Sequence, residues 1–202
     1  MDIQDNKILH FKDCIDSFEN QINKVIGLDQ VGLTCFILCC CLVDTLSFYT
    51  IDESRNSDRY QNFIKEFLSK VNAKYSDKDT ANKIYHGLRC SLVHAFSISK
   101  GIIIAENIPA QHLTSDKHGN ILIDLKSFYQ EILETKKLVY KKLTTSKEIR
   151  RLFLKRYMDT PPLEVYKTIE ALDENNLAVS GTKSLPTKSY SVVNYGRRKN
   201  YR

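Results

Sequence analysis

The chain has 202 residues, of which 42% are hydrophobic and 27% charged, the composition of an ordinary globular protein. Its 7 glycines and 4 prolines argue against a β fold with many turns and favour long helices. The net charge of +6 is unevenly distributed, since residues 1–135 carry −4 and residues 136–156 carry +8. A basic segment after an acidic domain favours phosphate ligands, although a solvated helix face has the same composition.

Three features of the sequence predict a cytoplasmic protein with no membrane span. Cys39, Cys40 and Cys41 are consecutive, which excludes a disulfide framework and indicates reduced core residues. The N-terminus is polar and acidic, unlike a signal peptide. The longest apolar run, residues 31–43, ends at Asp44 and is shorter than the roughly 20 residues that span a bilayer, so we expect a buried core helix.

The first half of the chain has the hydrophobic patterning of a helical bundle. Apolar residues recur every three or four positions over residues 6–26, which predicts an amphipathic helix. Residues 30–49 are apolar on nearly every side, so this second helix is expected at the centre. A third helix is predicted over residues 58–71, where aromatic and aliphatic side chains share one face.

The second half mixes short strands with further helices. Two β-branched runs, residues 101–105 and 120–124, flank a turn signal and predict a small β-hairpin with a long loop. Thr145-x-x-Glu148 is a capping-box pattern, and Thr160 can cap a later helix that has proline in its first turn. The helices expected after the hairpin cover residues 126–142, 145–158 and 163–172.

These elements predict an all-α fold class with a hairpin insertion, divided into three parts. We expect a helical domain over residues 1–145, a basic helical extension over 146–175 and a flexible basic tail over 176–202. Tyrosines alternate with arginine and lysine in the tail, which indicates either stacking on single-stranded bases or plain disorder.

The end of the fourth predicted helix contains the residues best suited to catalysis. This helix begins after a cap at Asp77 or Asp79, ends near Phe96 and places Arg89 and His94 five positions apart. Arginine is always charged and binds phosphate, and histidine can move a proton near neutral pH, so the pair predicts RNA cleavage without a metal. On an ideal α-helix the two side chains are about 140° apart, so convergence requires a fraying helix end or a second protomer.

Three segments, in order, resemble the HEPN superfamily. Residues 42–46 resemble its hydrophobic–Asp–x–Leu pattern, and residues 59–68 resemble its Arg-Phe-x-x-Phe helix. Residues 85–94 resemble Tyr-x-x-hydrophobic-Arg-Cys-Gly-Leu-hydrophobic-His, at the position of the family's Arg-x4-6-His signature. The resemblance covers about residues 5–143 and implies a four-helix bundle.

The resemblance also implies a function, a homodimer and a set of site residues. In catalytic members the arginine and histidine of two protomers form one cleft, where the ribose 2′-hydroxyl attacks the adjacent phosphate without a metal or cofactor. Here His94 would move the proton and Arg89 would stabilise the phosphorane. Such a ribonuclease would act on RNA as a toxin or defence effector, with an antitoxin or other protein as a partner. The supporting residues would be Asp44, His86 and Cys90.

The basic segment is expected to bind the RNA phosphates, because the first 135 residues are acidic. Binding through phosphates would be independent of RNA sequence. The residues expected in this role are Lys141, Lys142, Lys147, Arg150, Arg151, Lys155 and Arg156, with Lys136 and Lys137 beside them.

Other interpretations of the same residues remain open. Cys90 occupies a position where the most active relatives carry a polar residue, which favours a non-catalytic module that binds RNA or a protein. Arg89 could pair with Asp44 and simply close the bundle. His94 could be a helix C-terminal histidine favoured by the dipole. His86, Cys90 and His94 also form a stripe that could present three zinc ligands, although no fourth is evident and no metal is expected.

Overall fold

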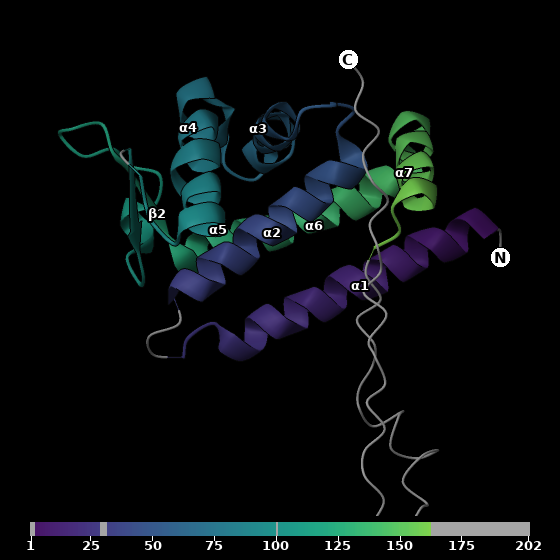
Figure 1. Cartoon of the computed structure of the whole chain (residues 1–202), viewed down its shortest axis with the longest axis horizontal. Coiled ribbons are helices and arrows are strands. Elements are labelled where there is room, and N and C mark those ends of the chain that lie inside the picture. The colour runs from purple at the N-terminus through teal and green to yellow at the C-terminus, as the bar shows by residue number, and fades with distance from the viewer. Residues whose placement is uncertain (1–2, 29–31, 100, 163–202) are drawn as a thin grey trace, which may run out of the picture. The chain divides into compact units, whose positions relative to one another are not determined.

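The computed structural model describes residues 3–28, 32–99 and 101–162 and shows a mostly helical unit with one small sheet (Figure 1). The expected helix over 163–172 and the tail over 176–202 lie outside the described residues. The helices are α1 (Ile3–Val25), α2 (Gly32–Thr50), α3 (Asn56–Glu66), α4 (Lys78–Lys83), α5 (Ser91–Ala95), α6 (Leu125–Thr145) and α7 (Lys147–Asp159). The strands are β1 (Ile102–Ala105) and β2 (Ile121–Asp124).

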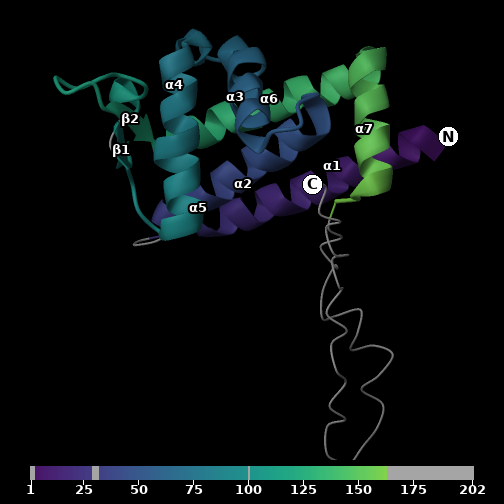
Figure 2. The ribbon, with the colours of Figure 1, turned by 45° about the horizontal axis from the view of Figure 1, so that its top comes forward.

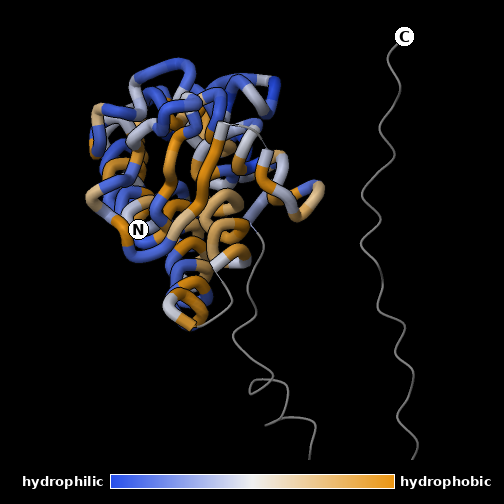
Figure 3. Tube along the Cα trace, turned by 90° about the vertical axis from the view of Figure 1, so that its left-hand side faces the viewer, coloured by the Kyte–Doolittle hydropathy of each residue, from blue (hydrophilic) through white to orange (hydrophobic). Residues whose placement is uncertain are grey.

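The apolar helix α2 lies at the centre of the unit, as its sequence predicts. It contacts α1, α3, α6 and α7, and Figures 1 and 2 show α1 and α6 running along it while α3 and α4 stand across it. By length and composition alone α2 could cross a membrane, a test that the core helix of a globular domain also passes. About half of it is buried inside the unit, and Figure 3 shows hydrophobic residues concentrated between the elements.

Aromatic side chains join α1, α2 and α7 into one core. Phe11 of α1 lies with its ring centroid 4.8 Å from that of Tyr49 in α2 and 5.2 Å from that of Phe153 in α7. All three are buried, and aromatic pairs at such edge-to-face distances add stability beyond area burial. Ser146, and not Thr145, caps α7, because its hydroxyl accepts from the amide of Ile149. The α7 helix thus packs into the core that α1 and α2 form.

The expected β-hairpin is wrong, because β1 and β2 pair in parallel with Ile102 opposite Ile121. Parallel strands cannot be joined by a tight turn and need a connection of a dozen or more residues. The link over residues 106–120 is long enough for this return, and it adds an antiparallel bridge between Ser115 and Ile121. The two strands are therefore assembled by a long loop that packs back on them.

Candidate functional site

The candidate site lies on one continuous helical rod, residues 78–95, whose middle turn is widened. Asp77 begins the rod, since its carboxylate accepts from the amide and hydroxyl of Thr80. The α4 helix continues through a π-helical turn, η3 (Ile84–Cys90), into α5. A π-helix bonds residues five apart and occurs frequently at functional sites. Gly87 lies in this turn, where a Cβ would come 2.7 Å from Cγ1 of Ile102, so only glycine lets β1 approach.

Arg89 and His94 meet within one chain. Nη1 of Arg89 lies 3.1 Å from Nε2 of His94, although the residues are five positions apart. The expectation that convergence requires a fraying helix end or a second protomer is therefore wrong, because it compared only the directions in which the two side chains leave the backbone, and the long side chain of Arg89 reaches His94 of α5. Arginine only donates hydrogen bonds, so Nε2 of His94 is the acceptor of this contact.

Arg89 is held in place from the other side by Asp44 of α2. Nε and Nη2 of Arg89 each lie 2.7 Å from Oδ2 of Asp44. The side chains are only 13% and 21% exposed, respectively. Burial raises the pKa of Asp44 against the opposing effect of Arg89. Burial lowers the pKa of Arg89, but the hydrogen bonds and charge of Asp44 outweigh it and raise the net value. The guanidinium therefore stays charged.

The guanidinium retains donors for a ligand. Arginine has five N–H groups, the contacts with Asp44 and His94 use three of them, and the guanidinium also interacts with Cys90. One of the remaining two is on Nη1, the nitrogen that also contacts the exposed His94. Arg59 of α3 adds positive charge near Asp44 and Arg89. Burial lowers the pKa of Arg59, the charge of Asp44 raises it, and the charge of Arg89 lowers it. The arrangement can bind an anion beside a group that accepts a proton.

The supporting residues lie around this pair with different surroundings. The guanidinium carbon of Arg89 lies 5.9 Å from the ring centroid of the buried Tyr85. Cys90 is partly buried against the core and forms side-chain interactions with Tyr85 and Arg89. His86 is exposed, and its ring lies edge-on to Tyr85. No group of three or more His, Cys, Asp or Glu side chains among the described residues could hold a metal ion, so the zinc interpretation of His86, Cys90 and His94 has no support.

Three residues of the basic segment are engaged by other parts of the unit. Lys136 is bonded to Asp16 and Glu19 of α1. Arg156 donates to the carbonyl oxygens of Phe48 and Ile51 at the end of α2, where a helix leaves its last carbonyls unsatisfied.

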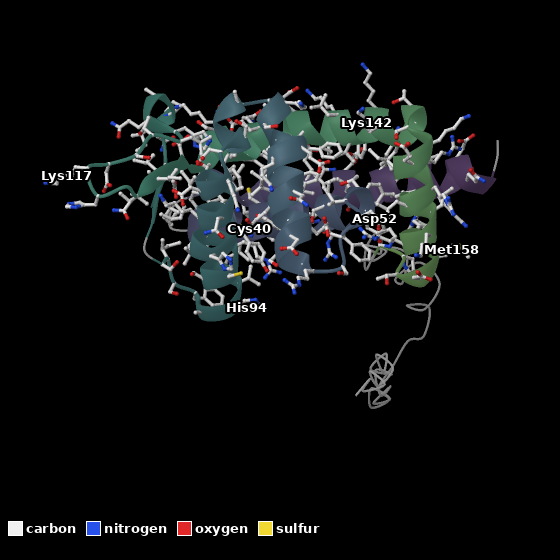
Figure 4. The ribbon with its side chains drawn as sticks, turned by 90° about the horizontal axis from the view of Figure 1, so that it is seen from above. Cys40, Asp52, His94, Lys117, Lys142 and Met158 are labelled. Atoms are coloured by element: carbon white, nitrogen blue, oxygen red, sulfur yellow. The ribbon has the colours of Figure 1, made fainter. Side chains whose placement is uncertain are left out.

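The third is Arg150, whose Nη2 lies 2.7 Å from the carboxylate of Asp5. The remaining residues of the segment with the expected phosphate-binding role are exposed: Lys141, Lys142, Lys147, Arg151 and Lys155. Figure 4 places Lys142 and His94 on opposite edges of the unit, so Lys142 does not adjoin the Arg89–His94 pair.

A buried polar cluster around His112 is a feature that the sequence did not indicate. Nδ1 of His112 accepts from the amide of Asp124, and Nε2 lies 2.9 Å from Glu131. The Tyr75 hydroxyl and the Asn72 amide also donate to Glu131. The members come from a 3₁₀ turn, the long link and α6, so no local spacing could have revealed the cluster. It ties the link beside the sheet to α6.

Comparisons with protein-family models, with curated proteins and with solved structures found no match to this chain.

Proposed function

We propose that this protein is a metal-independent endoribonuclease of the HEPN type, in which Arg89 and His94 act together on RNA. The observation that carries the proposal is the 3.1 Å contact between a charged guanidinium and an exposed imidazole at the end of one helical rod. A cation that binds phosphate and a neutral base that accepts a proton are the groups that RNA transesterification requires.

The proposed step uses these two residues, the RNA and a proton donor for the leaving oxygen. Neutral His94 releases its contact with Arg89 and takes the proton of a ribose 2′-hydroxyl on Nε2, and the 2′-oxygen forms a bond to the adjacent phosphorus. The bond from phosphorus to the 5′-oxygen breaks, and that oxygen leaves with a proton from water or from the imidazolium of a second protomer. The products are a 2′,3′-cyclic phosphate and a 5′-hydroxyl. Arg89 stabilises the extra negative charge on the phosphorane with the N–H groups that Asp44 does not hold.

The test is cleavage of RNA by the purified protein in the presence of a metal chelator. We expect wild type to cut and His94→Ala to lose on the order of 10²–10⁴ in rate, the usual contribution of a general acid or base. His94 is exposed, so its truncation leaves the fold intact, which circular dichroism would verify. A wild-type protein that leaves RNA uncut, or that cuts only with a divalent metal, refutes the mechanism.

The second candidate function is a non-catalytic module of the same type that binds RNA or a protein. Two observations favour it: Cys90 packs partly against the core instead of supplying a polar group, and Arg89 has a structural partner in Asp44. RNA that binds to wild type and remains intact would select this function.

The proposed biological setting is a cytoplasmic homodimer that acts on RNA as a toxin or defence effector, with a protein antitoxin or other protein partner. The Arg89–His94 contact forms within one chain, so the partner protomer would supply the second proton-transfer group and not the pair itself. Sedimentation of the wild type at micromolar concentration tests the dimer, and a monomer that still cuts RNA removes the second protomer from the mechanism.

A further inference from the structure

Phe96, two residues after His94, has a backbone conformation and a solvent exposure that are both unusual for a large aromatic residue. Its φ of 48° and ψ of 36° are left-handed, the conformation in which glycine ends many helices and which a bulky residue rarely adopts. The residue is 74% exposed, more than any other large hydrophobic residue in the described ranges. The residue thus combines local strain with little burial.

Neither property is explained by stability. Glycine at this position would relieve the left-handed conformation, and a polar residue would suit the exposure. Strained residues that persist in a fold cluster at functional sites, and a large aromatic group in water is a binding surface for another ring. Phe96 is therefore a candidate for contact with a ligand.

The position of Phe96 identifies what kind of ligand it would meet. Consecutive Cα atoms are 3.80 Å apart, so those of His94 and Phe96 can be at most about 7.6 Å apart. A strand whose phosphate is bound by Arg89 and His94 has a nucleobase close to this ring. Stacking on an aromatic side chain requires a base that is free from its neighbours in a duplex, because paired bases are already stacked and enclosed.

We propose that Phe96 is a stacking platform for an unpaired base next to the cleaved phosphate, so that the substrate is single-stranded RNA. This inference rests on the proposed function, since it takes RNA to be the ligand of the Arg89–His94 pair. Stacking on a π-face tolerates every base, so Phe96 selects strandedness and not sequence.

The experiment measures binding and cleavage separately. The binding probe is a 2′-fluoro RNA strand that carries the fluorescent base 2-aminopurine. The strand cannot be cut because it lacks 2′-hydroxyls, and the fluorescence of 2-aminopurine falls when the base stacks. We expect Phe96→Gly and Phe96→Leu to weaken binding about 5- to 150-fold, which corresponds to ~1–3 kcal/mol for one stacked base, and to abolish the fluorescence change. Phe96→Tyr and Phe96→Trp keep both. A duplex of the same sequence should bind equally to all variants.

Stability supplies the matched control. Phe96→Gly should raise the melting temperature by about 2–4 °C, because it removes the strain, so weaker binding cannot be attributed to unfolding. Unchanged binding and unchanged cleavage of single strands in Phe96→Gly overturn the inference and leave the nuclease proposal standing. A Phe96→Gly protein that sediments at a lower mass assigns the ring to a contact between two copies of the chain, which also overturns it.

The failures of the two proposals differ in their readouts. If Phe96-dependent fluorescence quenching occurs but natural RNA stays intact, the nuclease proposal fails and the stacking platform stands. If wild type neither binds the 2′-fluoro strand nor cuts natural RNA, both proposals fail.

Discussion

The pair formed by Asp44 and Arg89 allows the structural and catalytic roles of the arginine to be separated. Removing one partner of a fully buried ion pair costs about 3–5 kcal/mol, whereas exposed pairs contribute about 0–1 kcal/mol. Since these side chains are 21% and 13% exposed, we expect Asp44→Ala and Arg89→Met each to lower the free energy of unfolding by about 2–4 kcal/mol. Each variant leaves one charge largely buried without its partner.

The double variant Asp44→Ala/Arg89→Met removes both charges and fills the space with an apolar side chain. We expect it to be more stable than the sum of the single effects by about 1–3 kcal/mol, measured by urea unfolding at pH 7. The exposed pair of Glu134 and Lys137 is the matched control, because the same cycle there should give a coupling below about 0.5 kcal/mol.

Cleavage assays on the same proteins give the decisive comparison. Arg89→Met and the double variant should both fail to cut RNA, although the double variant has recovered part of its stability. Asp44→Ala should retain cleavage at a reduced rate, since Arg89 is still present but no longer held at 2.7 Å from a carboxylate. If the double variant regains activity together with stability, Arg89 has only a structural role and the reasoning is refuted.

Three further predictions concern the rest of the unit. Gly87→Ala should cost about 1–3 kcal/mol in thermal unfolding, because its Cβ would lie 2.7 Å from Ile102, and adding Ile102→Ala should recover part of that cost. Burial would raise the pKa of Glu131, but hydrogen bonds from His112, Tyr75 and Asn72 lower it overall, so its stabilising effect is complete above about pH 4.3 and declines as the pH falls further. The difference in free energy of unfolding between wild type and Glu131→Gln should therefore shrink from pH 5 to pH 3, and a constant difference would contradict the linkage. Neutralising the exposed basic side chains to glutamine should flatten the salt dependence of RNA affinity by roughly 0.7 for each phosphate that the protein no longer neutralises, while kcat stays unchanged because Lys142 and His94 lie on opposite edges. The residues to change are Lys141, Lys142, Lys147, Arg151 and Lys155.

The helices were predictable because hydrophobic periodicity and caps are local signals. The patterns over residues 6–26 and 30–49 correspond to α1 and α2, and Asp77 caps α4 as expected. The apolar character of α2 also predicted its central position, since a helix that is hydrophobic on every side has no face for water. For these elements, the information lies within one or two helical turns of each residue.

The strand pairing was not predictable in the same way. Residues 102–105 and 121–124 have the β-branched composition of strands, and this part of the expectation is confirmed. Their relative direction depends on the path of residues 106–120, which is set by contacts with distant elements such as the bonds of His112 to Asp124 and Glu131. Composition specifies a strand, whereas tertiary packing specifies its partner and direction.

The candidate site was predictable in its residue types and not in its geometry. The residue types Arg89, His94 and Asp44 and their functional chemistry could be inferred from spacing, but their convergence could not, because α-helical geometry separates positions 89 and 94 by about 140°. In that geometry an arginine directed at Asp44 inside the unit would leave the histidine facing elsewhere. The long arginine side chain resolves this conflict, since one guanidinium bonds a carboxylate of α2 and contacts an exposed imidazole of α5. The proposed chemistry therefore depends on the guanidinium itself, because Asp44 holds one side of it while another side contacts His94.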